Sequence, residues 1–208
     1  QVEVRPLEGF VFAVTPFNFT SIAANLPSAP ALMGNTCVWK PSRNSYVSNY
    51  RILRVMMDAG LPPGVINFLP GPASVVGDTC LASPALAGIH FTGSTGVFRQ
   101  LWREVGERIA SYRSYPRIVG ETGGKDFILA HPDCDREALT VALLRGAFEF
   151  QGQKCSAASR AYVPASVWAA IKDSYAAEVN RIVVGDVTKA GVYMGAVIDK
   201  KAFTSITG

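Results

Sequence analysis

The sequence predicts an α/β protein built on a Rossmann-like parallel sheet, followed by part of a second α/β domain. Short runs of β-branched and aromatic residues alternate with longer stretches of helical period, and each run ends in turn residues. Strands joined by helices in this rhythm pair in parallel, and a parallel sheet needs helices on both faces. The composition agrees, because 49% hydrophobic and 17% charged residues in a chain of 208 are typical of a globular protein with a sizeable core.

The strands expected in the first part of the chain are short, apolar and followed by turns. They are 11–14, 36–39, 65–68, 88–91 and 117–119. The helices expected between them are 21–34, 45–59, 73–82 and 95–113. The second of these helices has the most regular period, and Gly60 ends it. We expect one face of it to carry Tyr46, Tyr50, Leu53 and Met57.

The pattern restarts after Gly123 and Gly124, which we expect to form a hinge between a first part, 1–123, and a second part, 124–208. The second part is predicted to hold two further strands, 127–130 and 160–163, each followed by a helix. Either Asp133 or Asp135 is placed to cap the first of these helices. The other helix is expected near 166–181.

Charge and histidine content argue against several partners. The net charge is +4, but Glu104 and Glu107 interrupt the densest basic stretch, 99–117, which indicates a solvated helix face and not a nucleic-acid surface. No apolar run approaches the roughly 20 residues that span a bilayer. His90 and His131 are isolated, so no metal cluster is expected. We therefore expect neither a nucleic-acid partner nor a membrane partner.

The four cysteines lie far apart and show no metal-type or disulfide-type spacing, which favours a reducing, intracellular compartment. Cys37 and Cys80 lie in apolar runs, and we expect buried thiols there. Cys155 differs, because it follows an apolar helical run and stands in a polar turn beside Lys154. A neighbouring ammonium favours the reactive thiolate, and the alternative is another buried structural thiol.

Two more polar positions have alternative readings. Glu121 ends a β-branched strand and precedes two glycines, where a ligand can approach closely; it is either a general base or a solvated side chain. Asn18 lies between two aromatic residues after a strand, and it is either a turn residue or an amide donor to an oxyanion.

Two strand ends have the chemistry of anion binding. Residues 92–96, Thr-Gly-Ser-Thr-Gly, connect a strand to a helix, and a helix N-terminus binds anions through its free N–H groups. The segment is not a complete G-x-G-x-x-G motif, so by itself it is a weak signal for a dinucleotide. Lys40, at another strand end, is either solvated or bound to a ribose or phosphate.

Taken together, five motifs resemble the aldehyde dehydrogenase superfamily, in order and over essentially the whole chain. They are TPFNF at 15–19, WKPS at 39–42, FTGST at 91–95, ETGGK at 121–125 and GQKC at 152–155. Within the superfamily, three further segments are similar to the dehydrogenases of glutamate γ-semialdehyde. These segments are 29–35, 148–157 and 159–164. The lysine at position 154 resembles the single-function type of these enzymes more than the fused type, which tends to carry arginine there.

The resemblance implies a role for each motif. It makes 1–123 part of a dinucleotide-binding domain and 124–208 part of a catalytic domain. The implied catalytic residues are Cys155 as nucleophile, Glu121 as the base that activates water, and Asn18 as the oxyanion donor. The implied cofactor-binding residues are Thr15, Pro16, Lys40, Ser42, Gly93 and Ser94. The implied substrate-binding residues are Phe19, Lys154 and Ser156.

The implied reaction is the NAD(P)-dependent oxidation of L-glutamate γ-semialdehyde to L-glutamate, through a cysteine thiohemiacetal and a thioester, in proline catabolism. NAD is the expected cofactor. NADP stays open, because Arg43 stands where many members carry a glutamate that chelates the ribose hydroxyls, and a cation at this position could tolerate a 2′-phosphate. Two alternatives also stay open: an aldehyde dehydrogenase with another substrate, or a truncated fragment without catalysis.

The superfamily chains are longer at both ends, and this chain begins at Gln1 without a methionine. We therefore expect a fragment of a protein that forms a homo-oligomer when it is full length. The expected compartment is the cytoplasm if the source is bacterial and the mitochondrial matrix if it is eukaryotic.

Overall fold

The computed structural model describes residues 3–208, and the chain divides into two compact units, Gln1–Gly123 and Gly124–Gly208. We call them unit 1 and unit 2. The division falls between the two glycines that the sequence singled out as a hinge.

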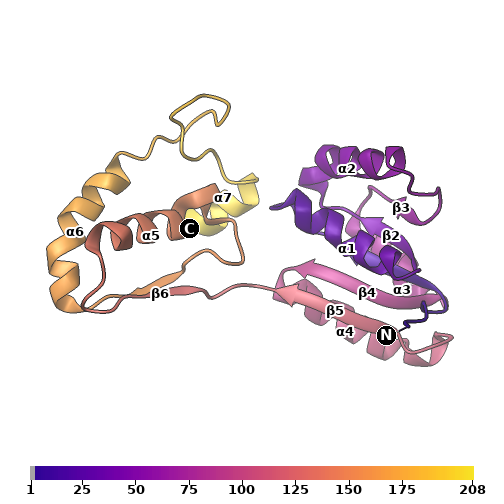
Figure 1. Ribbon diagram of the computed structural model, residues 1–208. Coiled ribbons are helices and arrows are strands. Elements are labelled where there is room, and N and C mark those ends of the chain that lie inside the picture. The colour runs from indigo at the N-terminus through magenta and orange to yellow at the C-terminus, as the bar shows by residue number, and fades with distance from the viewer. Residues whose placement is uncertain (1–2) are drawn as a thin grey trace. The chain divides into compact units, whose positions relative to one another are not determined.

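Unit 1 is a parallel sheet covered by helices, as the sequence predicted (Figure 1). Its strands are β1 Phe10–Val14, β2 Thr36–Lys40, β3 Ile66–Phe68, β4 Leu86–Gly93 and β5 Arg117–Thr122. Its helices are α1 Thr20–Leu32, α2 Tyr46–Asp58, α3 Ala73–Ala82 and α4 Thr95–Glu107, with 3-10 turns η1 Arg43–Ser45 and η2 Ile109–Ser111. All neighbouring strands pair in parallel in the order β3-β2-β1-β4-β5. This is the strand order of a Rossmann fold.

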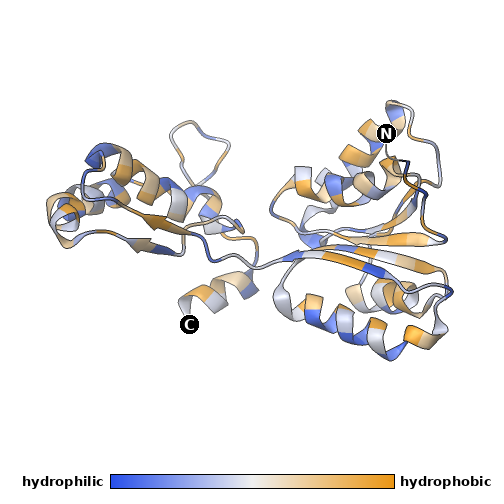
Figure 2. Cartoon of the chain, turned by 60° about the horizontal axis from the view of Figure 1, so that its bottom comes forward, coloured by the Kyte–Doolittle hydropathy of each residue, from blue (hydrophilic) through white to orange (hydrophobic). Residues whose placement is uncertain are grey.

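Both faces of the sheet are buried, because successive side chains of a strand point to opposite sides. In the central strand β1, Val11 packs into the cluster formed with α1 and α2, whereas Phe12 packs into the cluster formed with α3 and α4. The strands of unit 1 are accordingly drawn mostly in the hydrophobic colour in Figure 2. The rigid sheet fixes where each strand ends, and those ends carry the polar candidates.

Two details of unit 1 differ from the sequence prediction. On α2, Leu53 is buried as expected, but Tyr50 is 50% exposed and Asn49 is fully buried in its place. The Asn49 Nδ2 donates to Ser45 Oγ at 3.0 Å, which satisfies half of the amide, whereas its buried Oδ1 has no partner among the described residues. The helix expected over 95–113 ends at Glu107 and continues only as a 3-10 turn.

Unit 2 is a smaller α/β assembly. Its elements are β6 Phe127–Leu129, α5 Arg136–Phe148, the 3-10 turn η3 Glu149–Gly152, β7 Arg160–Tyr162, α6 Ala165–Asn180 and α7 Lys200–Thr207. Strands β6 and β7 pair in parallel, and the core lies where α5 and α6 meet. The buried core residues are Ala130, Leu139, Leu143, Val167 and Ile171. Of the two possible caps for α5, Asp135 is the one used, because its carboxylate accepts the Ala138 N–H at 2.8 Å.

Among the helices of residues 3–208, none combines the length and apolar character that crossing a membrane requires. Within the same residues, no cluster of three or more His, Cys, Asp or Glu side chains is suited to hold a metal ion.

Candidate active site

The cofactor-binding candidates of unit 1 gather at one edge of the sheet. Lys40 ends β2, Gly93 ends β4, and Thr15 follows β1 directly. Glu121 is the next-to-last residue of β5 and pairs with Thr92 of β4. Because the strands are parallel, all these positions lie at their carboxyl ends, which is where ligands bind in open α/β sheets.

Thr15 is held within the fold. Its side chain is only 4% exposed, and its hydroxyl accepts the Trp39 indole N–H at 2.9 Å. Its backbone N–H donates to the Lys40 carbonyl at 3.2 Å. These bonds fasten the ends of β1 and β2 to each other. The Thr15 hydroxyl therefore already has a hydrogen-bond partner within the fold. The predicted roles of Thr15 and of the half-buried Pro16 in cofactor binding stay predictions.

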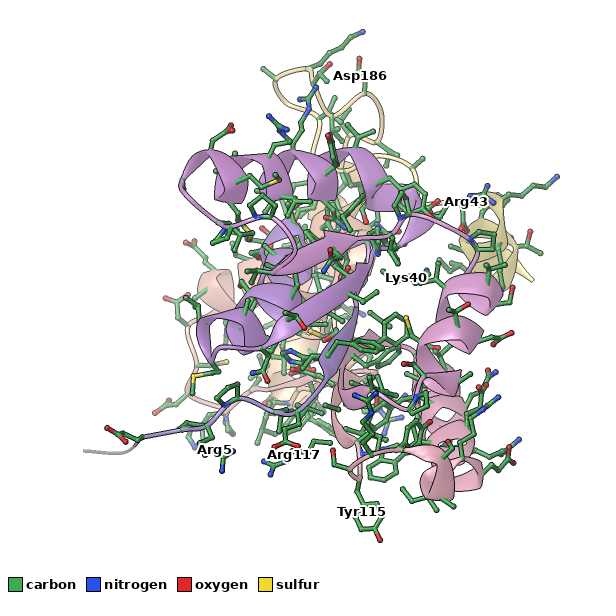
Figure 3. The ribbon with its side chains drawn as sticks, turned by 90° about the vertical axis from the view of Figure 1, so that its right-hand side faces the viewer. Arg5, Lys40, Arg43, Tyr115, Arg117 and Asp186 are labelled. Carbon is green, nitrogen blue, oxygen red and sulfur yellow. The ribbon has the colours of Figure 1, made fainter. Side chains whose placement is uncertain are left out.

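Lys40 is half-buried, and its ammonium donates to the Pro41 carbonyl at 3.2 Å. Burial lowers the pKa of Lys40, because desolvation disfavours the charged form. An ammonium has three donors, so this bond leaves others for a hydroxyl or phosphate. Ser42 makes no side-chain cap bond to η1, and the exposed Arg43 adds a second cation to this strand end (Figure 3, where Lys40 and Arg43 are labelled).

The end of β4 leads directly into α4. Ser94 caps this helix by accepting the Val97 N–H at 3.4 Å, and within the described chain the first helical turn carries no acidic residue. Gly93 leaves room for the Phe91 ring, because a Cβ at this position would lie 2.7 Å from the ring and would require it to shift. At Gly96, no described atom lies within 4 Å of where a Cβ would stand. The N-terminal turn is thus open to an anionic group.

The sequence interpretation passed over Gly96 as a site residue. The signal was available, because it is the second glycine of the Thr-Gly-Ser-Thr-Gly segment.

Asn18 and Phe19 lie in the connection between β1 and α1, and both are half-buried. Phe19 has extended backbone dihedrals at the N-cap position of α1, and its carbonyl accepts the Ala23 N–H at 3.0 Å. The helix start therefore fixes this short segment next to the carboxyl end of β1. The predicted roles of Asn18 and Phe19 need a substrate, and they stay predictions.

Glu121 is exposed. The predicted role of Glu121 as a general base stays a prediction. The backbone beside it is held closely, because a Cβ on Gly120 would overlap the Phe98 ring, with ring atoms 2.6 and 2.7 Å away. The Phe98 ring stacks in turn on Phe91, with centroids 5.7 Å apart. This packing fixes the strand segment that carries the carboxylate.

The nucleophile candidate lies in unit 2, on a segment that we call the nucleophile loop, residues 149–157. Helix α5 ends at Phe148, and three consecutive residues then adopt left-handed dihedrals: Phe150 with φ 54°, Gln151 with φ 57° and Gly152 with φ 66°. The left-handed region costs a non-glycine residue about 1–2 kcal/mol. This turn reverses the chain and presents Cys155 half-buried.

The backbone around Cys155 is held on several sides within unit 2. A Cβ on Gly124 would overlap the Cys155 carbonyl oxygen and would lie 2.7 Å from its carbonyl carbon, so Gly124 packs directly on the nucleophile. Downstream, the Ala158 N–H donates to the Gly146 carbonyl at 2.8 Å. The sequence identified Gly124 only as part of a hinge, and its contact with Cys155 came from the tertiary structure.

Two other thiols, Cys37 and Cys80, are buried as predicted. Burial raises the pKa of the first thiol to about 12 and of the second to about 11. His90 is also structural, because its Nδ1 lies 2.9 Å from the Leu26 carbonyl.

Lys154 is paired with a carboxylate that the sequence interpretation overlooked. Its ammonium contacts Glu149 in an ion pair, and Arg145 donates to the other oxygen of Glu149 at 2.7 Å. The hydrogen bonds from Lys154 and then from Arg145 lower the pKa of Glu149 to about 2. Lys154 is thus a cation that already has a partner, whereas Ser156 is exposed. A glutamate five residues before the lysine was the available signal.

Gly124→Ala should distort the nucleophile loop, because the added methyl group overlaps the Cys155 carbonyl. We expect the free energy of unfolding to fall by about 1–3 kcal/mol, the usual cost of overpacking, in chemical denaturation. The matched control is Gly77→Ala in α3, where no described atom lies within 4 Å of the new Cβ and stability should stay equal or rise slightly. Equal stability of the two variants would contradict the proposed contact.

Glu149→Gln should change how stability depends on pH. The folded-state pKa of Glu149 is lowered to about 2, so its ion pairs stabilise the protein above the unfolded pKa of about 4.3 and are lost as pH falls towards 2. We expect the variant to be less stable than the natural protein at pH 7 and the difference to shrink between pH 5 and pH 2, measured by denaturation. Glu178→Gln, which breaks the exposed pair with Arg181, is the control and should change little. A difference that is constant from pH 7 to pH 3 would refute this.

The comparisons with known proteins agree with one another. The aldehyde dehydrogenase family model matches residues 1–208. The chain is 49% identical, over its whole length, to delta-1-pyrroline-5-carboxylate dehydrogenase of Agaricus bisporus, of which it covers 38%. It is 50% identical, over 99% of its length, to the mitochondrial enzyme of that name from Emericella nidulans, of which it covers 36%.

Solved structures give the same result. The NAD-bound delta-pyrroline-5-carboxylate dehydrogenase of Mycobacterium tuberculosis is 55% identical, with a TM-score of 0.94 over 97% of this chain and 38% of that one. The chain therefore spans a little over a third of the length of these relatives. The α/β fold with its parallel sheet is the aldehyde dehydrogenase fold, as the sequence predicted. The chain belongs to the aldehyde dehydrogenase family.

Proposed function

We propose that this chain is the part of a longer enzyme that binds NAD and carries the nucleophile, and that the enzyme oxidises L-glutamate γ-semialdehyde to L-glutamate in proline catabolism. The observation that carries the proposal is the nucleophile loop, which presents the half-buried Cys155 between Lys154 and Ser156. The relatives that share about half of its residues are named delta-1-pyrroline-5-carboxylate dehydrogenases, which supports the substrate.

The carboxyl edge of the unit 1 sheet suits a dinucleotide. We propose that Lys40 and Ser42 bind the adenosine ribose and that Gly93, Ser94 and the open first turn of α4 bind the pyrophosphate. Thr15 and Pro16 would contact the cofactor at the end of β1. NAD supplies the acceptor for the hydride when it is bound. The NAD-bound relative supports NAD, and the exposed cation of Arg43 keeps NADP as the alternative.

The first chemical step is assigned to Cys155. Its thiolate attacks the aldehyde carbon, a C–S bond forms, and the carbonyl electron pair moves to oxygen. The Asn18 amide and the Cys155 backbone N–H would donate to this oxyanion, and one such donor is worth about 3–4 kcal/mol. Collapse of the oxyanion restores the C=O bond as the hydride leaves the same carbon with its electron pair. The product on Cys155 is a thioester.

The second step is assigned to Glu121. Its carboxylate takes a proton from water while the water oxygen adds to the thioester carbon. The C–S bond then breaks, the thiolate of Cys155 is regenerated, and a carboxylic acid is released. The exposure of Glu121 within unit 1 is compatible with access to water.

Substrate recognition is assigned to three side chains. Lys154 and Ser156 would bind the α-carboxylate of the substrate, and Phe19 would pack on its carbon chain. Lys154 has donors to spare beyond its contact with Glu149, so one ammonium can serve both carboxylates. The same ion pair favours the alternative of an aldehyde without a carboxylate, because Glu149 already compensates the charge of Lys154.

For the full-length protein we propose a homo-oligomer that acts on a small molecule. Its compartment would be the mitochondrial matrix in a eukaryote, as in the mitochondrial relative of Emericella nidulans, or the cytoplasm in a bacterium. A fragment with no catalysis of its own remains the alternative for the chain by itself, since it spans just over a third of its relatives.

The full-length protein should prefer glutamate γ-semialdehyde to pentanal, an uncharged aldehyde of equal carbon-chain length. A charge-assisted contact with Lys154 predicts a ratio of kcat/KM of about 10–100. Lys154→Met should remove most of this preference by raising KM for the charged substrate, with little change for pentanal. Equal kcat/KM values for the two aldehydes in the natural protein would favour the uncharged-substrate alternative.

Glu121→Gln should slow hydrolysis of the thioester more than its formation. We expect a burst of NADH close to one per active site, followed by a steady-state rate at least about a hundredfold lower than that of the natural enzyme. Cys155→Ser should show neither burst nor turnover. Glu107→Gln, an exposed residue of α4, is the control and should keep the natural rate. A normal steady-state rate for Glu121→Gln would refute the assignment of the base.

A further inference from the structure

The nucleophile loop needs external support, because its backbone is strained. Phe150 and Gln151 are the non-glycine residues with positive φ among residues 3–208, and they are adjacent. Such strain persists only where the surroundings over-determine the conformation. The contacts that hold this turn therefore also decide where Cys155 lies, only four residues after Gln151.

Gln153 makes contacts in two directions. Its backbone N–H and its Nε2 donate to the Phe150 carbonyl, at 3.0 and 3.4 Å, and these bonds close the left-handed turn. Its Oε1 accepts the Ile198 N–H at 2.9 Å, from a residue 45 positions further along the chain. One carboxamide thus connects the strained turn to a distant part of unit 2.

The distant part is a segment with little regular structure, residues 183–198, which has its own internal bonds. Val184 and Met194 form a β-bridge, and the Gly185 N–H donates to the Met194 carbonyl at 3.0 Å. The segment also packs on the turn at Gly195, where a Cβ would lie 3.2 Å from Gln151 Nε2. It is therefore an ordered surface against which the turn is fastened, and Gln153 supplies the hydrogen bond.

We propose that Gln153 is a positioning residue for Cys155, which holds the thiol in place by bonding the nucleophile loop to the 183–198 segment through Ile198. The geometry is the basis for this role. Gln153 lies two residues before Cys155, and its carboxamide bonds both the Phe150 carbonyl of the nucleophile loop and the Ile198 N–H of the 183–198 segment. Its effect on turnover rests on the proposed function, whereas its effect on the thiol and on the segment does not.

The test compares Gln153→Met, which removes the acceptor, with Gln153→Glu, which keeps an oxygen at Oε1. In the full-length protein, Gln153→Met should lower kcat by about tenfold to a hundredfold at nearly unchanged KM, because a small displacement of the reacting atom is costly. It should also change the rate at which iodoacetamide alkylates Cys155 by more than about threefold, localised by mass spectrometry. Gln153→Glu should restore most of both properties.

Hydrogen exchange separates positioning from general loosening. Gln153→Met should speed exchange in 183–198 while α5 and α6 keep their protection. Gln100→Met is the matched control, because it removes a carboxamide that bonds Glu104 on the surface of α4, and it should change none of these quantities. Alkylation and exchange need no turnover, so they test Gln153 even if the protein oxidises no aldehyde.

Three outcomes would overturn the proposal. One is unchanged alkylation of Cys155 in Gln153→Met. Another is faster exchange spread evenly over α5 and α6, which indicates general destabilisation of unit 2. The third is a Gln153→Glu variant as impaired as Gln153→Met, since the retained acceptor would then have no effect.

Discussion

The parallel pairing of β1 with β2 on one side and β4 on the other is the constraint on which unit 1 depends. Parallel strands bury both faces, so the chain alternates Val11 and Phe12 into two separate clusters. Parallel strands also end at the same edge. Polar residues that are far apart in the sequence, such as Lys40 and Gly93, are thereby placed along one line of strand ends. The hydrogen bond from the Trp39 indole to the buried Thr15 hydroxyl joins the ends of β1 and β2 at this edge.

The loop of unit 2 that carries Cys155 depends on a different kind of contact. There, stable helix packing ends at Phe148, and a left-handed turn that is unfavourable by itself delivers Cys155. Gly124 packs on the Cys155 backbone, the Gly146 carbonyl accepts the Ala158 N–H, and the Gln153 carboxamide bonds both the Phe150 carbonyl and the Ile198 N–H. The Cys155 thiol is half-buried in a polar loop, whereas Cys37 and Cys80 lie in apolar surroundings whose burial disfavours their thiolates.

Sequence patterns predicted the order and approximate bounds of the strands and helices of unit 1, apart from the end of α4, since hydrophobic periodicity reports directly on burial. They were less reliable where a polar residue is buried. Asn49 occupies the core-facing stripe of α2 in place of Tyr50, and its Nδ2 donates to Ser45 Oγ, a bond that no sequence pattern reports. The motif at Cys155 likewise marked the residue but not the turn before it, because left-handed dihedrals at Phe150 and Gln151 leave no glycine signal.

By itself the sequence determined the α/β class, the family, the elements that carry each candidate residue and the burial of two thiols. These follow from local hydrophobic periodicity and from short motifs that occur in the expected order and spacing along the chain. Only the tertiary structure decided that Glu149 and Arg145 share the charge around Lys154, that Gly124 lies on the Cys155 backbone and that Gln153 bonds Ile198. The physical reason is that these contacts join positions brought together by chain reversal and packing. Residue type and spacing carry no record of which donor meets which acceptor.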